Sequence, residues 1–184
     1  MSNIELEARF TDIDPQNLIE FAKNLGAEDK GSKFLKETIF YDKELKWRSE
    51  GKYARLRSFD NKNIFTYKHI TKEAVDGAEE IEFEVTHPDN LQLFLERVGL
   101  IPFRVQEKKR HTLELEGVTL DFDQWPLIPP YLEIEGKSEE KIREIALQLG
   151  LKWEDTVFSD ARKIIEGYGV DVSKFTYFTF EKCE

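Results

Sequence analysis

Charged and apolar side chains alternate in one segment after another of this 184-residue chain. In the first such segment, residues 4–10, the charged residues Glu5, Glu7 and Arg9 are separated by apolar ones. Because successive side chains of a β-strand point to opposite faces, this spacing predicts a strand with one charged and one apolar face. A single strand of this kind is typical of a sheet with one solvated side. Its recurrence along the chain calls for a more specific explanation.

The same alternation predicts further strands, and their charged faces carry both signs. Basic residues share a face at Arg55 and Arg57, at Lys68, and at Lys108 and Arg110. The acidic residues that share a face are Glu80, Glu82 and Glu84, then Asp121 and Asp123, then Glu133 and Glu135. The expected strands are residues 4–10, 33–42, 53–59, 64–69, 79–86, 102–116, 118–125 and 131–135.

Apolar residues at helical spacing predict four helices, at residues 12–26, 87–99, 138–150 and 156–167. Asp14 and Pro15 suit the start of the first helix, and Ser138 suits the start of the third. We expect residues 47–51 to form a polar connection. Residues 175–180 alternate, so they would add an edge strand or pack over an opening. Since no linker divides the chain, we expect a single domain over residues 1–184.

Closing the sheet into a barrel explains both faces of the strands at once. The apolar faces would meet helices packed outside, and the charged faces would line a polar tunnel. Lysine and arginine match phosphate oxygens, whereas carboxylates repel phosphate but suit a hard divalent cation. The pattern therefore favours an α+β fold, a closed antiparallel β-barrel with helices outside, and a metal-assisted polyphosphate site in its lumen.

The composition narrows the classes of partner. A net charge of -10 argues against a nucleic-acid partner, and no apolar run reaches membrane-spanning length. Cys183 is the single cysteine, which fits a reducing compartment, and no basic-then-apolar signal pattern opens the sequence. We expect a cytoplasmic protein with no membrane partner. The choice between a monomer and a homodimer is left open. His69, His87 and His111 lack metal-ligand spacing.

The segment Glu5-Leu6-Glu7-Ala8-Arg9 resembles the ExExK signature of the CYTH superfamily, also called triphosphate tunnel metalloenzymes. Later segments follow the family's order, and these are Arg55-Leu56-Arg57, Thr66-Tyr67-Lys68, Glu80 to Glu84, Lys108-Lys109-Arg110, Asp121 and Leu132-Glu133-Ile134-Glu135. The resemblance implies an eight-stranded antiparallel tunnel with helices outside. The family includes class IV adenylate cyclases, thiamine triphosphatases and inorganic tripolyphosphatases.

The resemblance also implies a role for each charged position. The residues that would hold Mg²⁺ or Mn²⁺ are Glu5, Glu7, Glu133 and Glu135, with Asp121 in support. The residues that would hold the triphosphate are Arg55, Arg57, Lys68, Lys108 and Arg110. The candidate catalytic residues are Arg9, Lys68, Lys108 and Arg110, and the accessory candidates are Glu82, Glu84 and Asp123.

One position departs from the family signature, because Arg9 stands where the signature has lysine. Arginine keeps the positive charge and can bind phosphate through two N–H groups, but its pKa is too high for it to act as a base. We therefore expect Arg9 to hold a phosphate oxygen or to orient Glu5 and Glu7, and not to carry a proton.

The sequence leaves three classes of function. The first is a metal-dependent enzyme that acts on triphosphates, most like a class IV adenylate cyclase that converts ATP to cyclic AMP and pyrophosphate. Its alternative is a triphosphatase that hydrolyses tripolyphosphate, thiamine triphosphate or a nucleoside triphosphate. The second class is a non-catalytic triphosphate binder, and the third is a sheet with a solvated charged face and no ligand. Length and motif spacing favour the cyclase.

Overall fold

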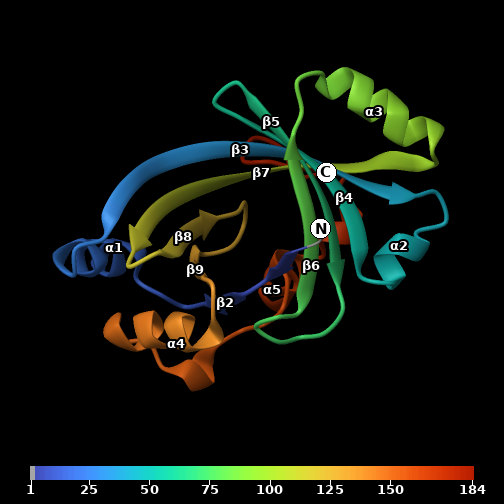
Figure 1. Ribbon diagram of the computed structural model, residues 1–184. Coiled ribbons are helices and arrows are strands. Elements are labelled where there is room, and N and C mark those ends of the chain that lie inside the picture. The colour runs from blue at the N-terminus through green and yellow to red at the C-terminus, as the bar shows by residue number, and fades with distance from the viewer. Residues whose placement is uncertain (1–2) are drawn as a thin grey trace.

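A computed structural model describes residues 3–184, and Figure 1 shows how its strands curve around one another. The strands are β1 (Asn3–Glu5), β2 (Glu7–Phe10), β3 (Glu28–Asp42), β4 (Lys52–Phe59), β5 (Lys62–Ile70), β6 (Ala78–Glu84), β7 (Leu100–Leu115), β8 (Val118–Gln124), β9 (Tyr131–Glu135) and β10 (Tyr177–Phe178). The helices are α1 (Pro15–Asn24), α2 (Lys46–Ser49), α3 (Pro88–Arg97), α4 (Glu139–Gln148) and α5 (Ala161–Gly167), with 3₁₀ turns at η1 (Trp153–Asp155) and η2 (Val172–Lys174).

The sheet is a nearly closed antiparallel barrel, with the strand order β1-β6-β5-β4-β3-β7-β8-β9-β2. Its two end strands, β1 and β2, are separated in sequence by Leu6 alone. The expected barrel is confirmed, but nine strands follow this path instead of eight because the expected strand 4–10 is broken. At the break, Glu7 N donates to Val75 O at 3.1 Å and Gly136 N donates to Leu6 O at 3.1 Å. The first segment of the chain therefore pairs with both ends of the sheet, because β1 pairs with β6 and β2 pairs with β9.

The two longest strands, β3 and β7, pair from Glu28↔Glu114 to Asp42↔Leu100 and form the back of the barrel. Both extend beyond the expected ranges. Two register shifts interrupt this ladder, one of them at Gly31, whose positive φ of 83° glycine adopts without strain. Such shifts bend long strands, which is how a sheet curls round a lumen.

The expected hairpin between β4 and β5 is confirmed. Asp60 and Asn61 have φ values of 45° and 63°, the pair of positive angles that a type I′ turn requires. This turn fixes the register in which Arg57 faces Ile64 and Arg55 faces Thr66. Because side chains alternate, that register places both arginines on the same face of the sheet.

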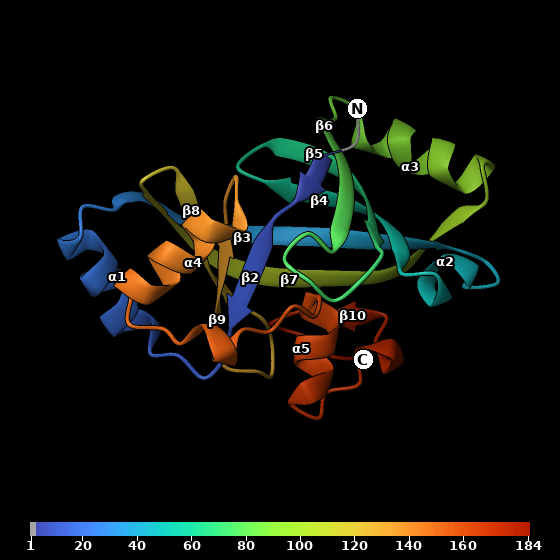
Figure 2. The same ribbon diagram turned by 60° about the horizontal axis from the view of Figure 1, so that its bottom comes forward.

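The apolar faces of the strands point outward and pack against helices, as expected. On one side, Leu113, Leu120 and Ile134 of the sheet pack with Ile142 and Ile145 of α4, and all five are 0% exposed. Figure 2 shows α1 and α4 together over this part of the barrel. Asp14 begins α1 by accepting from Asn17 N, and Ser138 begins α4 by accepting from Lys141 N, so both expected caps are present.

A second apolar cluster lies under α3. Leu95 of this helix packs on Phe40 of β3 and on Leu56 of β4. The short helix α2 occupies part of residues 47–51, where a polar connection was expected. It forms because the Asp42 carboxylate accepts from the backbone N–H groups of Lys46 and Trp47.

The C-terminal segment differs most from the expectation. The expected helix 156–167 is wrong at its start, because Val157 and Arg9 form a β-bridge and α5 begins only after Asp160. The expected edge strand in residues 175–180 is reduced to β10, which pairs in parallel with β7. Figure 2 shows α5 and β10 together at one side of the barrel. None of the helices described over residues 3–184 is both long and apolar enough to cross a membrane.

Candidate functional site

The lumen of the barrel holds a cavity of about 310 Å³. Charged residues from strands on every side line this cavity. The lining residues that the sequence predicted are Glu5, Arg9, Arg55, Arg57, Lys68, Glu80, Glu82, Lys108, Arg110, Glu133 and Glu135. Residues far apart in the sequence therefore meet at one place, which excludes a flat sheet with a solvated charged face.

Four of the predicted site residues are not part of the lining. Glu7, Asp121 and Asp123 are buried and pair with lining residues, so they form a layer beside the cavity. Glu84 is exposed at the end of β6 and contacts none of the other site residues through an ion pair in the described chain.

Arg9 is 4% exposed and links two carboxylates. Its Nη2 lies 2.5 Å from Glu7 Oε2, and its Nε donates to Glu133 Oε2 at 2.7 Å. A third N–H group donates to the carbonyl of Ser159 at 3.1 Å. Burial alone would lower the pKa of Arg9, but Glu7 and Glu133 raise it well above its ordinary value. Arg9 is thus a fixed cation, and it orients Glu7 and Glu133 instead of Glu5 and Glu7.

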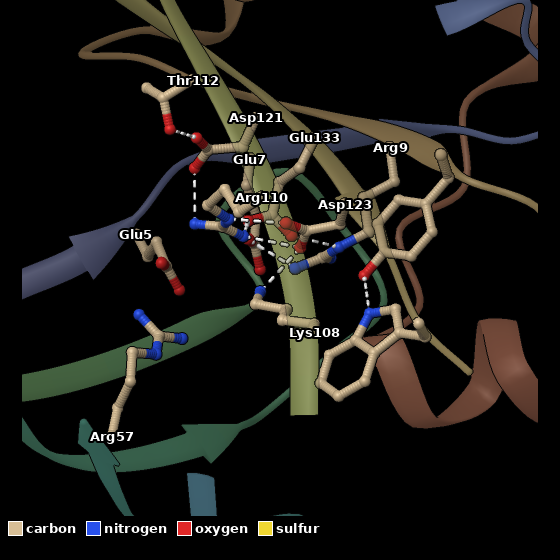
Figure 3. A network of polar contacts seen from close by, with 12 residues as sticks. Glu5, Glu7, Arg9, Arg57, Lys108, Arg110, Thr112, Asp121, Asp123 and Glu133 are labelled. Carbon is tan, nitrogen blue, oxygen red and sulfur yellow. Dashed lines mark hydrogen bonds and ion pairs between the residues drawn. The ribbon is translucent and has the colours of Figure 1, made fainter. Parts of the chain in front are cut away.

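A second network joins β7, β8 and β9, as Figure 3 shows. Lys108 Nζ donates to Asp123 Oδ2 at 2.6 Å, and Arg110 Nε donates to Asp123 Oδ1 at 2.6 Å. Arg110 also contacts Asp121 at 2.5 Å and Glu133 at 3.0 Å. Asp123 is fully buried, and its two cations hold its pKa below the ordinary value although burial opposes this. The network fixes Lys108 and Arg110 at the wall of the cavity.

Lys68 is different from Lys108 in its electrostatic surroundings. It donates to Glu5 and to Glu7 and lies 3.5 Å from Glu80. Burial would lower the pKa of Lys68, but Glu7 and Glu5 raise it overall. Burial together with the nearby Arg110 lowers the pKa of Lys108. Lys108 is therefore the lysine of this site that gives up a proton more readily.

Negative charge is in excess near Glu5 and Glu135. Burial, with the neighbouring carboxylates of Glu7 and Glu80, raises the pKa of Glu5 to about 7. Burial and the proximity of Glu5 and Glu133 likewise raise the pKa of Glu135 to about 7. Glu135 is nonetheless an exposed residue, so solvent screens this repulsion. No ion pair within residues 3–184 neutralises Glu135.

This excess of carboxylate oxygens is the donor chemistry that a hard divalent cation prefers. Among the described residues, however, no three acidic or other ligating side chains converge on a single point as they stand. Arg9, Lys68 and Arg110 occupy the oxygens of Glu7, Glu5 and Asp121. The residues present fit a divalent cation by their chemistry, and binding one would exchange some of these ion pairs for metal contacts.

Positive charge predominates on the other wall, at Arg55 and Arg57. Glu37 is 1% exposed and accepts from Arg57 Nε at 2.8 Å and from Gln106 Nε2 at 2.7 Å. Burial would raise the pKa of Glu37, but the two arginines hold it well below its ordinary value. Arg55 is 3.8 Å from Glu37, and its Nε is buried without a hydrogen-bond partner in the described chain. An anion in the cavity would supply the missing acceptor.

Several lining residues were not singled out from the sequence, namely Glu37, Tyr53, Arg104, Gln106, Asp160 and Arg162. Arg104 and Gln106 have the same parity as Lys108 on β7, so extending that alternation backward would have found them. Asp160 and Arg162 come from the segment around α5, where no alternation marks the face that meets the barrel.

The histidines lie outside the lining. His111 is on the outer face, where its Nδ1 is 2.8 Å from Ser32 Oγ and its Nε2 is 3.0 Å from Asp29 Oδ1. Trp125 lines the cavity but is only 2% exposed. Its Nε1 donates to the Tyr131 hydroxyl at 3.1 Å, and Lys108 Nζ lies 5.2 Å from its ring centre. Trp125 therefore supports the wall of the cavity.

A nearly closed antiparallel barrel with acidic and basic residues facing each other across its lumen defines the class of charged β-tunnels. The chain belongs to the CYTH domain family, whose sequence model matches residues 1–168. Comparison with curated proteins gives no match.

Solved structures share this tunnel. A protein from Pyrococcus horikoshii is 26% identical with a TM-score of 0.72, over 85% of this chain and 96% of that one. A Vibrio parahaemolyticus "putative adenylate cyclase" is 15% identical with a TM-score of 0.76, over 90% of this chain and 99% of that one. A Hippeastrum "putative adenylyl cyclase", reported with a dominant triphosphatase activity, is 17% identical with a TM-score of 0.62, over 92% and 96%. The last two likenesses establish the fold alone.

Proposed function

We propose that the lumen binds a triphosphate together with a divalent cation and that the chain is a metal-dependent triphosphatase. The observation that carries this proposal is Arg55, whose buried Nε lacks an acceptor at the wall of the cavity. A buried donor without a partner costs free energy that a bound anion recovers. A phosphate oxygen suits the planar guanidinium because it accepts paired, charge-assisted hydrogen bonds.

The remaining cations surround the place where such an anion would lie. Arg57 comes from the same strand as Arg55, and Lys108 and Arg110 come from β7. Each is held by a buried carboxylate, either Glu37 or Asp123, and is thus pre-organised before the ligand arrives. Pre-organised cations stabilise the charge that develops on transferred phosphoryl oxygens.

The acidic wall would hold the metal. Glu5, Glu7, Glu133 and Glu135 supply oxygen ligands for Mg²⁺ or Mn²⁺, with Asp121 beside them. Such an ion, when bound, neutralises charge on the phosphate oxygens and lets anionic ligand and anionic wall coexist. This pairing explains why a site that recruits phosphate also contains so many carboxylates.

Hydrolysis fits the cavity better than cyclisation. A cyclase has to hold a nucleobase and present the ribose hydroxyl to the α-phosphorus, whereas a triphosphatase needs only water at the γ-phosphorus. Trp125, an aromatic residue of the lining, is buried and its ring is covered by Lys108, so it offers no open face to a base. In hydrolysis the water oxygen bonds to the γ-phosphorus and passes one proton to a γ-phosphoryl oxygen as the bridging P–O bond breaks. Lys108, with its lowered pKa, is suited to protonate the leaving oxygen.

Phosphorus NMR tests the proposed reaction. The protein is incubated with tripolyphosphate, ATP or thiamine triphosphate in the presence of Mg²⁺ or Mn²⁺. The proposal expects orthophosphate with pyrophosphate from tripolyphosphate, and orthophosphate with ADP from ATP. Cyclic AMP with pyrophosphate would instead establish the cyclase. Binding of tripolyphosphate without turnover would establish a non-catalytic binder.

The triphosphate clamp is the set of cations Arg55, Arg57, Lys108 and Arg110. Two variants distinguish binding by this clamp from general effects on the fold. Arg55→Gln removes the cation whose Nε lacks a partner and should weaken tripolyphosphate binding by about 10- to 100-fold, the scale of one or two charge-assisted hydrogen bonds. Arg97→Gln alters an exposed arginine at the end of α3, remote from the lining, and should bind like the wild type. Equal binding by both variants would contradict the clamp.

A further inference from the structure

A further cation is buried in the lumen beyond the clamp. Arg104 is on β7, four residues before Lys108, and is only 6% exposed. Its Nε donates to Gln106 Oε1 at 2.9 Å, and its Nη1 donates to the carbonyl of Val172 at 3.0 Å. No carboxylate within residues 3–184 pairs with Arg104. A buried guanidinium without a counter-ion is costly, so its retention calls for an explanation.

Other hydrogen-bond donors share that part of the cavity. Tyr41, Tyr53 and Arg162 line the same cavity as Arg104. Burial raises the pKa of Tyr53 to about 12 and also raises the pKa of Tyr41, so both phenols remain donors at neutral pH. Burial lowers the pKa of Arg104, and Arg48 and Arg162 act in the same direction, so positive charge accumulates here.

Two acidic residues belong to the same region. Glu37 is linked to Arg104 through Gln106, which accepts from Arg104 and donates to Glu37, and it raises the pKa of Arg104 against the effect of burial. Asp160 lines the cavity, but one of its oxygens accepts from Lys163 N at the start of α5. Its other oxygen lies 3.9 Å from Arg162 Nε, at the limit of an ion pair. Asp160 therefore leaves Arg104 without an ion-pair partner. Arg162 has a second carboxylate nearby, since its Nη1 lies 3.6 Å from Glu166 Oε1, so its charge is neutralised in part.

We propose that Arg104, Arg162, Tyr41 and Tyr53 form a second anion subsite, which holds a phosphoryl group that the triphosphate clamp does not reach. This inference rests on the proposed function, because it extends the ligand bound there. Arg104 is separated from Lys108 by four strand residues, about 13 Å at the rise of an extended chain. It shares a cross-strand row with Arg55, because both pair with Ile39, so the added group would lie beside the Arg55 end of the triphosphate. The phosphoryl group is either a fourth phosphate in a linear chain or a phosphate on the sugar of a nucleoside triphosphate.

A nucleobase is a poorer occupant for this subsite. The Tyr41 and Tyr53 rings could contact a base, but a neutral base would leave the Arg104 guanidinium buried and unpaired. A phosphoryl group neutralises Arg104 and accepts from both phenols at once. Electrostatic complementarity thus favours an anion at this end of the cavity.

Calorimetric titration distinguishes these ligands. Binding is measured in excess chelator, which prevents metal-dependent turnover, at an ionic strength of about 0.15 M. The ligands are tripolyphosphate, tetrapolyphosphate, ATP and the nucleotide that carries a 5′-triphosphate and a 3′-phosphate. We expect tetrapolyphosphate or the 3′-phosphorylated nucleotide to bind about tenfold more tightly than its partner without the extra phosphate, the scale of one charge-assisted contact. The ligand whose affinity increases shows whether the group is a fourth phosphate of a linear chain or a phosphate on the sugar.

Variants show whether the gain arises at this subsite. Arg162→Gln and Tyr41→Phe should each reduce the preference for the extra phosphate by several fold, and Arg104→Gln should abolish it. Arg162 is partly exposed and Tyr41→Phe keeps the ring, so these two variants remain informative where Arg104→Gln disturbs folding. All three should bind tripolyphosphate within about twofold of the wild type. The exposed Arg97→Gln is the matched control and should keep both affinities.

The outcomes separate this inference from the proposed function. Tight binding of tripolyphosphate without any gain from an added phosphate overturns the second subsite and leaves the clamp intact. A gain that persists unchanged in the Arg162→Gln and Tyr41→Phe variants also overturns it. Tighter binding of ATP than of tripolyphosphate, with no gain from a further phosphate, assigns the pocket to a base. A wild-type protein that binds none of the ligands in chelator, and does not bind tripolyphosphate when Mg²⁺ or Mn²⁺ is added, refutes the proposed function as well.

Discussion

Arg9 Nε donates to Glu133 Oε2 at 2.7 Å, across the β2–β9 pair in which these two residues face each other. The same guanidinium also contacts Glu7 and the Ser159 carbonyl. A lysine ammonium is a single point charge and cannot reach three acceptors in a fixed planar arrangement. The departure from the family's lysine therefore gives this chain a cation that fastens β2, β9 and the segment before α5 together.

Removal of Arg9 should destabilise the fold. In Arg9→Ala, Glu7 and Glu133 lose their shared cation while remaining buried, so we expect the free energy of unfolding to fall by about 3 to 5 kcal/mol. Arg9→Lys keeps the charge but fewer hydrogen bonds, and should cost roughly 1 to 2 kcal/mol while retaining substantial turnover. Urea unfolding measures both, with the exposed Arg97→Ala as control. An Arg9→Ala protein as stable as the wild type would show that Arg9 does not fasten these strands.

Replacement of Glu37 should make the stability of the protein depend more strongly on the bound ligand. In Glu37→Gln, Arg55 and Arg57 lose their buried counter-charge, so the ligand-free protein should lose about 3 kcal/mol of stability. Tripolyphosphate supplies the missing negative charge, so it should raise the melting temperature of this variant by more than that of the wild type. Thermal unfolding with and without tripolyphosphate measures the difference. Equal ligand-induced shifts would mean that the phosphate does not contact these arginines.

The stability of the metal-free protein should depend on pH through Glu5. Burial raises the pKa of this carboxyl from 4.5 to about 7, so the folded state binds more protons than the unfolded chain between these values. The free energy of unfolding should therefore fall as the pH rises from about 4.5 to about 7. Glu5→Gln should make that part of the profile less steep, with the remaining slope due to Glu135, whose pKa is also raised to about 7. Glu139→Gln on α4 should keep the wild-type profile. A wild-type profile that rises over this interval would contradict the assignment.

Turnover should require a divalent cation, and Glu135 offers the cleanest test of where it binds. Unlike Glu133, Glu135 has no ion pair in the described chain, so Glu135→Gln should leave the fold intact. We expect activity at a fixed Mg²⁺ or Mn²⁺ concentration to drop by at least about tenfold, because the amide removes an anionic ligand. Glu84→Gln, outside the cavity, is the control. Full activity in excess chelator would exclude the metal requirement.

The barrel was predictable because each strand carries the alternation of charged and apolar residues within its own sequence. Arg55 and Arg57, or Glu133 and Glu135, alternate with apolar residues, and a charged face that is not solvated has to turn inward. The position of the break at Leu6 was not predictable. It depends on hydrogen bonds to Val75 and Gly136, which are distant in sequence.

The candidate site was predictable where it lies on strands. Parity identified Lys108 and Arg110, and the same parity extends to Gln106 and Arg104. The pairing of charges was not predictable, because parity says which face a side chain shares but not which partner it contacts. Arg9 thus contacts Glu133 and not Glu5. Glu5 accepts a hydrogen bond from Lys68 instead.

A crystal structure of the protein with tripolyphosphate and Mn²⁺ tests the central claim most directly, since manganese is located by its anomalous scattering. The account predicts the phosphates inside the lumen, with oxygens within hydrogen-bond distance of Arg55 and Arg57, and a manganese peak beside Glu5 and Glu135. Tripolyphosphate bound only on the outer surface of the barrel, with the lumen free of phosphate, would contradict it.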